Sequence, residues 1–336
     1  MRVTNSGDLA TSLLLARNQA DTKARIATLS REVSTGRHSD VAVVLKGETR
    51  GLSDLTHRLT LLDSYNRNTA EAASRLTAVQ GALAAMDSVA SVQGPALLAA
   101  AEQGSLALAA SLAEAEDNLA RSLGALNANW AGEYVFSGAA PSRPAVITPT
   151  ALMDAITPQI AGLGDAADII AAVDAFFDAA PGGGGFVDLG LTGATDPRGP
   201  VAIGAGESVR MDLTADAEAF RDLLKGAVLA VVAQRGGGTL APAAQSRLAA
   251  AAGERMLDAN QGLTALRAGQ GVLERQVELA KARNSSERAS LELARSDVVS
   301  ADPYRAAAAL VEAQVNLETI YEITARLSRL SLVNHL

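Results

Sequence analysis

The chain has 336 residues, a formal net charge of −8 and no cysteine. This length allows two or three domains, and the lack of thiols excludes a disulfide framework, a cysteine-based zinc site and a thiol nucleophile. The acidic balance disfavours nucleic acid as a partner, and no run of 18 apolar residues is present that would cross a membrane.

The N-terminal part of the chain predicts long helices. Apolar residues recur every three or four positions over residues 15–33, over 52–83 and, after an expected break at Gly94-Pro95, over 108–126. A mean spacing of 3.5 keeps one face of a helix against a partner and favours coiled-coil packing. The unbroken apolar run Leu13–Ala16 is too short for the apolar region of a cleaved signal peptide.

The middle of the chain is interrupted by helix breakers. Seven of the ten prolines lie between Pro141 and Pro200, together with four consecutive glycines, so long helices are not expected there. We expect short strands at 146–148 and 186–189, and a hairpin over 201–213 with a glycine turn. A short helix is expected within 156–180.

The C-terminal part returns to helix. A helix over 216–234 is expected to end at three glycines, and the apolar spacing then continues unbroken from Met256 to Val298, about 60 Å of helix at 1.5 Å per residue. A final helix follows Asp302-Pro303. The predicted fold is therefore mainly α, an elongated antiparallel helical bundle or coiled coil formed by the N- and C-terminal arms, with a small β-rich (α/β) inserted domain.

Four polar residues interrupt the apolar positions of the long helices. Asn66 and Gln80 lie in the first arm, and Gln270 and Asn284 in the second. Such residues either fix the register and partner of a helix pair or lie at the wet edge of a bundle. The sequence alone leaves both interpretations open.

Catalytic and cofactor motifs are weak or missing. The three histidines stand apart, without the spacing of metal ligands, and we expect no catalytic residue, no metal and no cofactor. Residues 162–167 fit GxGxxA, with Asp188 about 20 residues further on, but a dinucleotide site needs a buried strand before the glycines. An ordinary helix start is the favoured interpretation, and a dinucleotide-binding enzyme is a remote alternative.

Motifs near both ends and at the arm-to-insert junction resemble one family. The segment from Asn127 to Gly138 closes the first arm with the junction residues Gly132, Tyr134, Phe136 and Gly138. Segments 29–37, 203–224 and 325–336 are also similar to the bacterial flagellin superfamily, and in particular to its hook-associated branch at the hook–filament junction. The resemblance covers about 1–138 and 202–336.

This resemblance implies a modular chain. It implies an N-terminal assembly segment (1–51), long core helices (52–138), an inserted outer domain (139–213), further core helices (214–300) and a C-terminal assembly helix (301–336). The terminal segments would pack against those of neighbouring copies. The residues implied at this assembly interface are Leu15, Ile26, Leu29, Val33, Leu310, Leu317, Ile320, Leu327 and Leu330.

The implied function is structural rather than enzymatic. A protein of this branch would be an adaptor at the hook–filament junction, forming a ring with copies of itself and contacting a neighbouring hook-associated protein and flagellin. An export chaperone would shield its C-terminal segment, and the protein would reach the extracellular flagellum by type III export without a cleaved signal peptide. Neither nucleic acid nor membrane is expected as a partner. A filament-forming flagellin is the alternative.

Overall fold

The structure, a computed structural model, describes residues 4–333, with side chains described for residues 10–327. It divides into two compact units. We call Met1–Leu62 with Ser286–Leu336 the terminal unit and Asp63–Ser285 the central unit. Two long helices, α3 (Arg50–Gln103) and α10 (Pro242–Val299), contribute residues to both units.

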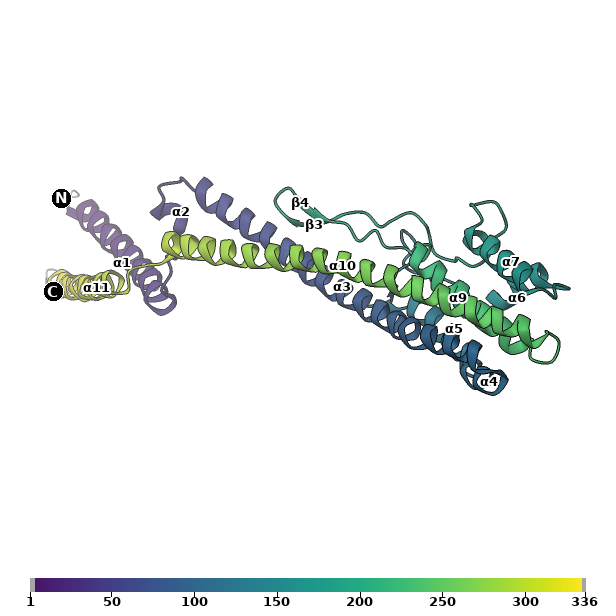
Figure 1. The fold of residues 1–336 in the computed structure, drawn as a ribbon. Coiled ribbons are helices and arrows are strands. Elements are labelled where there is room, and N and C mark those ends of the chain that lie inside the picture. The colour runs from purple at the N-terminus through teal and green to yellow at the C-terminus, as the bar shows by residue number, and fades with distance from the viewer. Residues whose placement is uncertain (1–3, 334–336) are drawn as a thin grey trace. The chain divides into compact units, whose positions relative to one another are not determined.

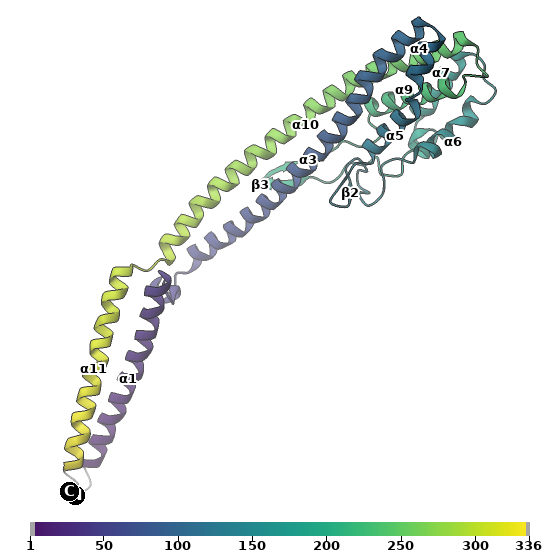
Figure 2. The ribbon, with the colours of Figure 1, turned by 90° about the horizontal axis from the view of Figure 1, so that it is seen from below.

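The terminal unit is built around two facing helices. α1 (Thr4–Thr35) and α11 (Pro303–Val333) lie side by side along their length (Figure 1; Figure 2). α11 begins with a capped turn, because the Asp302 carboxylate accepts hydrogen bonds from the amides of Tyr304 and Arg305 and proline occupies the first helical position. The short α2 (Val41–Val44) is capped in the same way by Asp40.

Two linkers of the terminal unit are hydrogen-bonded to each other. α1 ends at Thr35, and the next residue, Gly36, has the φ of +66° of the left-handed residue that often terminates a helix. The Gly36 carbonyl accepts from the amide of Ala301 at 3.0 Å, and the His38 amide donates to Val299 at 2.9 Å. The chain therefore leaves α1 and enters α11 through one short antiparallel β-bridge.

In the central unit, α3 continues where a break was expected. The predicted break at Gly94-Pro95 is wrong, since the helix runs to Gln103 with Pro95 inside it. A proline in a helix interior costs about 3 kcal/mol, but fully buried Ala90 and Leu97 pack into the core on either side of it and offset that cost. The turn comes at Gly104, with φ of +102°.

Two shorter helices follow this turn, where one had been expected. They are α4 (Ser105–Leu112) and α5 (Ala115–Leu126). Each buries apolar residues spaced by three or four, such as Leu108 and Leu112 in α4 and Leu119 and Leu126 in α5. Both helices pack against α9 (Glu218–Arg235).

The insert between the arms contains more helix than the sequence suggested. A small hairpin comes first, formed by two strands of two residues each, β1 (Asn129–Trp130) and β2 (Glu133–Tyr134). It is followed by three helices, α6 (Pro149–Ile160), α7 (Ala166–Asp178) and the single-turn α8 (Phe186–Leu189). The strand predicted at 186–189 is wrong, because Phe186 is buried against Phe177 in a helical turn. The strand predicted at 146–148 is reduced to one bridge between Val146 and Leu191.

The predicted hairpin is confirmed as β3 (Val201–Gly204) and β4 (Glu207–Val209), which pair antiparallel. Ile203 and Val209 are buried in a small apolar cluster with Leu76 of α3 and Val277 of α10. The Asn68 side-chain amide donates to the Ala202 carbonyl at 2.8 Å. The hairpin is thereby held on the long helices.

The core of the central unit surrounds α9. Thirteen residues of this 18-residue helix are buried, and they pack with α4, α5 and α7. The long helix expected from 256 to 298 is confirmed within α10, which starts earlier, at Pro242. The mainly-α fold with a small strand-containing insert is confirmed.

One stretch of α3 is apolar enough, by length and composition, to cross a membrane. Nearly half of that 18-residue window, 44%, is buried inside the protein. A helix at the centre of a bundle has this character, because its apolar residues face other helices rather than lipid.

The polar residues in the apolar rows of the long helices do not all lie at solvent-exposed positions. Gln270 and Asn284 are buried, and the Asn284 amide donates to the Ile203 carbonyl at 2.8 Å. The Gln80 amide donates to the Arg267 carbonyl of α10 at 3.0 Å. Gln80 therefore links α3 to α10 at one register, while Asn284 links α10 to the hairpin.

Candidate functional site

Residues implied at the assembly interface fall on the facing helices of the terminal unit. Six of them are half-buried: Leu15, Ile26, Leu29, Leu310, Leu317 and Ile320. Val33 and Leu327 are exposed, and the side chain of Leu330 lies outside the described residues. The half-buried positions recur every three or four residues on both helices, as expected when two helices pack along one face.

The register of this pair is antiparallel. Tyr321 of α11 lies against Gln19 and Lys23 of α1, while Gly36 is hydrogen-bonded to Ala301 at the other end. The residue range 29–33 therefore lies opposite the N-terminal half of α11. The hydrogen bonds between the two linkers fix this register at the point where the helix pairing begins.

Tyr321 should ionise below the usual pH of a tyrosine. Hydrogen bonds from Gln19 and Lys23 lower its pKa by stabilising the phenolate. Because this acidic group has a depressed pKa in the folded state, its contribution to α1–α11 pairing is present above about pH 10 and is lost as the pH falls through the folded-state pKa.

The shift can be measured as the difference in near-ultraviolet phenolate absorbance between the unmodified chain and Tyr321→Phe. We expect Lys23→Met to move this difference curve to higher pH, and Lys281→Met, in the central unit, to leave it in place. An unchanged curve in Lys23→Met would contradict the register.

A second apolar face of α11 points away from α1. Tyr304, Val311 and Val315 are 87%, 59% and 54% exposed. Their spacings of seven and four residues place them on one side of the helix, opposite the half-buried positions. These residues are not among those predicted from the sequence, although their spacing of seven and four residues is present there. Exposed apolar rows of this kind mark surfaces that contact other molecules.

The junction loop, Asn127–Gly138, joins the first arm to the insert. The Asn127 side chain bonds the amide and the carbonyl of Val146, at 3.0 and 2.9 Å. The Asn129 carboxamide oxygen accepts from the Gly132 amide at 2.9 Å, which closes the β1–β2 turn. Tyr134 donates its amide to the Pro141 carbonyl at 2.8 Å. The loop is thus fixed by side chains of the motif itself.

The end of the junction loop is buried. Phe136 is fully buried and packs edge-on against Phe220 of α9, with ring centroids 5.2 Å apart. Gly138 has φ of +54°, and an added Cβ would overlap the carbonyl oxygens of Asp196 and Ala194. The structure thus brings Phe136 and Gly138 into the core, while Gly132 lies at the exposed turn.

Glu133 of the junction loop carries the loop's ionic contacts. Its Oε2 lies 3.3 Å from Arg75 of α3 and 2.7 Å from Arg198 of the insert. Arg75 is only 4% exposed, and a buried guanidinium is stable only beside a compensating charge. One carboxylate thereby connects α3, the junction loop and the insert.

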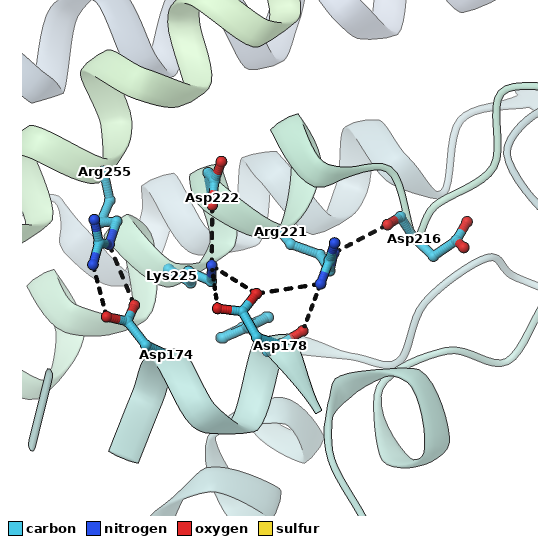
Figure 3. Close-up of polar contacts among 8 residues, drawn as sticks. Asp174, Asp178, Asp216, Arg221, Asp222, Lys225 and Arg255 are labelled. Atoms are coloured by element: carbon cyan, nitrogen blue, oxygen red, sulfur yellow. Dashed lines mark hydrogen bonds and ion pairs between the residues drawn. The ribbon is translucent and has the colours of Figure 1, made fainter. Parts of the chain in front are cut away.

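A second ionic cluster holds α7 against α9 and α10 (Figure 3). Asp174 forms a two-pronged pair with Arg255, with N–O distances of 3.3 and 2.7 Å. Asp178 accepts from Lys225 at 2.9 Å and from Arg221 at 3.2 Å. Bidentate arginine–carboxylate contacts fix the orientation of the two side chains as well as their distance. The cluster therefore sets the angle at which α7 packs against the core.

The charged state of this cluster is stabilised by its own carboxylates. Burial lowers the pKa of Lys225, but hydrogen bonds and charges from Asp178 and Asp222 outweigh it and leave the pKa raised. The hydrogen bonds that Arg255 donates to the Asp174 carboxylate raise the pKa of Arg255. Both side chains therefore remain cationic at neutral pH.

Residues 162–167, which fit GxGxxA, lack the preceding strand that a dinucleotide site requires. Residues 162–167 follow helix α6 rather than a strand, and Asp165 caps α7 by accepting from the Ala167 amide at 3.0 Å. Asp188 accepts hydrogen bonds from Gly182 and Gly184 and so supports its own loop. Among the described residues, no group of three or more His, Asp or Glu side chains forms a cluster that could hold a metal ion.

These features define a mainly helical protein, with a paired terminal unit that exposes apolar side chains and a central unit that carries an inserted region. Residues 4–140 match the family model described as the bacterial flagellin N-terminal helical region. The match spans α1 to the end of the junction loop and supports the bacterial flagellin superfamily. A comparison with curated proteins found no match.

Proposed function

We propose that this chain is a structural subunit of the bacterial flagellum that assembles through its terminal helices. The match over residues 4–140 carries the proposal, since proteins of this family are structural and polymerise. The terminal unit supplies a physical reason. α1 and α11 cover one apolar face by pairing, but Tyr304, Val311 and Val315 remain exposed.

Within this proposal the terminal residues have two roles. The half-buried set that includes Leu15, Ile26, Leu317 and Ile320 holds α1 to α11, and the outer face of α11 contacts neighbouring copies. The segments 1–51 and 301–336 would then form the assembly layer. An isolated pair of amphipathic helices is marginally stable in water, so assembly would stabilise it.

The more specific proposal is an adaptor at the hook–filament junction, exported to the extracellular flagellum with a chaperone on its C-terminal segment. The junction loop with Gly132, Tyr134, Phe136 and Gly138, which resembles that branch, favours it. A filament-forming flagellin is the second candidate, because the matched family model describes flagellin. Addition of purified chain to filament seeds separates the two: long polymers favour flagellin, and a stable monomer favours the adaptor.

Removal of residues 302–336 tests the assembly role. We expect a soluble protein whose central unit unfolds as in the intact chain, because its core lies within 63–285, but which no longer supports motility. Circular dichroism and a swimming assay provide the two measurements. Normal motility of the deletion strain would refute the proposal.

A point variant separates the outer face from the helix itself. Val311→Asp with Val315→Asp places two charges on the exposed apolar face, and we expect motility to be lost although α11 still forms. The matched control is Gln314→Asp with Asn316→Asp, which adds the same charges at exposed positions on the flanks of the same helix. Equal loss in both variants would contradict a specific role for the outer face.

A further inference from the structure

A groove lies between α3 and α5 in the central unit. It has a volume of about 450 Å³ and is lined on the α3 side by Ala85, Ser88 and Val92, and on the α5 side by Glu114 and Arg121. Val92 is 67% exposed. The α3 residues are spaced by three and four and are small or apolar, which is the surface that receives a third helix in a helix-in-groove contact.

α10 carries a matching ridge on the same unit. Val272 and Leu279 are 68% and 53% exposed and lie seven residues apart, with exposed Ala265 and Ala268 before them. Val272 is about two and a half turns from buried Leu263, so the ridge faces away from the core. We call residues 265–279 on this face the α10 ridge.

The groove and the ridge have complementary charges that lack partners. Glu114 stands at one end of the groove and makes no capping hydrogen bond. Arg275 is exposed on the flank of the ridge. Within residues 10–327, neither side chain is in an ion pair.

The two surfaces of one copy cannot meet. Gln93 of α3 donates to the Ser111 carbonyl at 2.7 Å, which places the start of α5 near Gly94, and Gly94 lies against Gly253 of α10. Arg275 is about 33 Å further along α10 at 1.5 Å per residue. Any contact between groove and ridge must therefore join different molecules.

We infer that the α3/α5 groove of one copy receives the α10 ridge of the next copy, with Glu114 opposite Arg275. The inference rests on the proposed flagellar assembly and names the surfaces that the central unit contributes to it. Because groove and ridge are different patches of one unit, the contact is head-to-tail, and such contacts produce rings or open helical polymers rather than closed dimers.

Cross-linking tests the contact directly, because the chain has no cysteine of its own. The full chain with Val92→Cys and Val272→Cys is expressed in its host, and flagella are isolated and oxidised. We expect a ladder of dimers, trimers and larger species on non-reducing gels, since groove and ridge Cα atoms would come within disulfide reach, about 4.4–6.8 Å. Either single substitution should give no ladder.

The outcomes separate this inference from the proposed function. A chain that is present in flagella but gives no ladder, gives dimers from a single substitution, or cross-links to a different protein would overturn the groove–ridge contact alone. A chain that is absent from flagella would overturn the proposed function and this inference with it.

Charge exchange provides the second test. Glu114→Arg and Arg275→Glu, each placed separately in the two-cysteine chain, should reduce the ladder about tenfold or more, because like charges would face each other. Co-expression of the two variants should restore it, since each then offers the surface that the other needs. The controls Glu71→Arg and Arg210→Glu change exposed charges elsewhere on the central unit. Failure of co-expression to restore the ladder would overturn the pairing.

Discussion

Replacing Gly253 by alanine is expected to destabilise the central unit by about 2–4 kcal/mol. At this point α3 and α10 approach so closely that a Cβ on Gly253 would lie 2.7 Å from the Gly94 carbonyl oxygen and 2.7 Å from Leu98. The carbonyl belongs to a helix backbone and cannot rotate away, so the two helices must separate. Chemical denaturation of the full chain measures the loss.

A second glycine of the same helix provides a matched control with the opposite sign. A Cβ on Gly271 would meet nothing within 4 Å, and alanine is favoured over glycine in a helix interior by about 1 kcal/mol. We therefore expect Gly271→Ala to stabilise the protein slightly. Equal effects at both positions would contradict a close crossing of α3 and α10 at Gly253.

Replacing Gly138 by alanine is expected to cost about 3 kcal/mol or more. The residue has φ of +54°, a conformation that disfavours any Cβ, and its Cβ would also overlap two carbonyl oxygens of the insert. Because the neighbouring Phe136 is buried against Phe220, displacement of the loop would disturb the core. Thermal unfolding followed by circular dichroism measures the change.

Gly132 is the control within the same loop. It too has positive φ, +87°, but a Cβ there would have open space around it. Gly132→Ala should therefore cost only the backbone strain, about 1 kcal/mol. A similar loss at Gly132 and Gly138 would show that backbone conformation alone, and not the close approach of the insert, requires glycine at residue 138.

The long helices were predictable because their evidence is repeated many times along the chain. Most turns of α10 between Met256 and Val298 carry an apolar residue at the expected spacing, so single exceptions such as Gln270 change little. The β3–β4 hairpin was also predictable, from two short strand-like segments on either side of a glycine turn. The helix break predicted at Gly94-Pro95 is wrong because it rested only on the low helix propensity of proline. Burial of Ala90 and Leu97 keeps α3 continuous through Pro95.

The motif of the junction loop predicted where the loop lies but not its ionic contacts. Its residues predicted the end of the first arm, and the structure adds that Phe136 and Gly138 are buried there. The motif did not predict that Glu133 would join Arg75 and Arg198, because these three residues are far apart in sequence. The same applies to Asp174 with Arg255 and to Asp178 with Lys225.

The long helices of the two arms, the β3–β4 hairpin and the apolar faces of α1 and α11 follow from the sequence by itself, since local spacing and local turn residues determine them. The tertiary structure alone decided the antiparallel register of the terminal pair, the ionic contacts of the insert, and which apolar residues remain exposed. These depend on residues that are distant in the chain, and their meeting is set by the packing of whole helices rather than by any local preference.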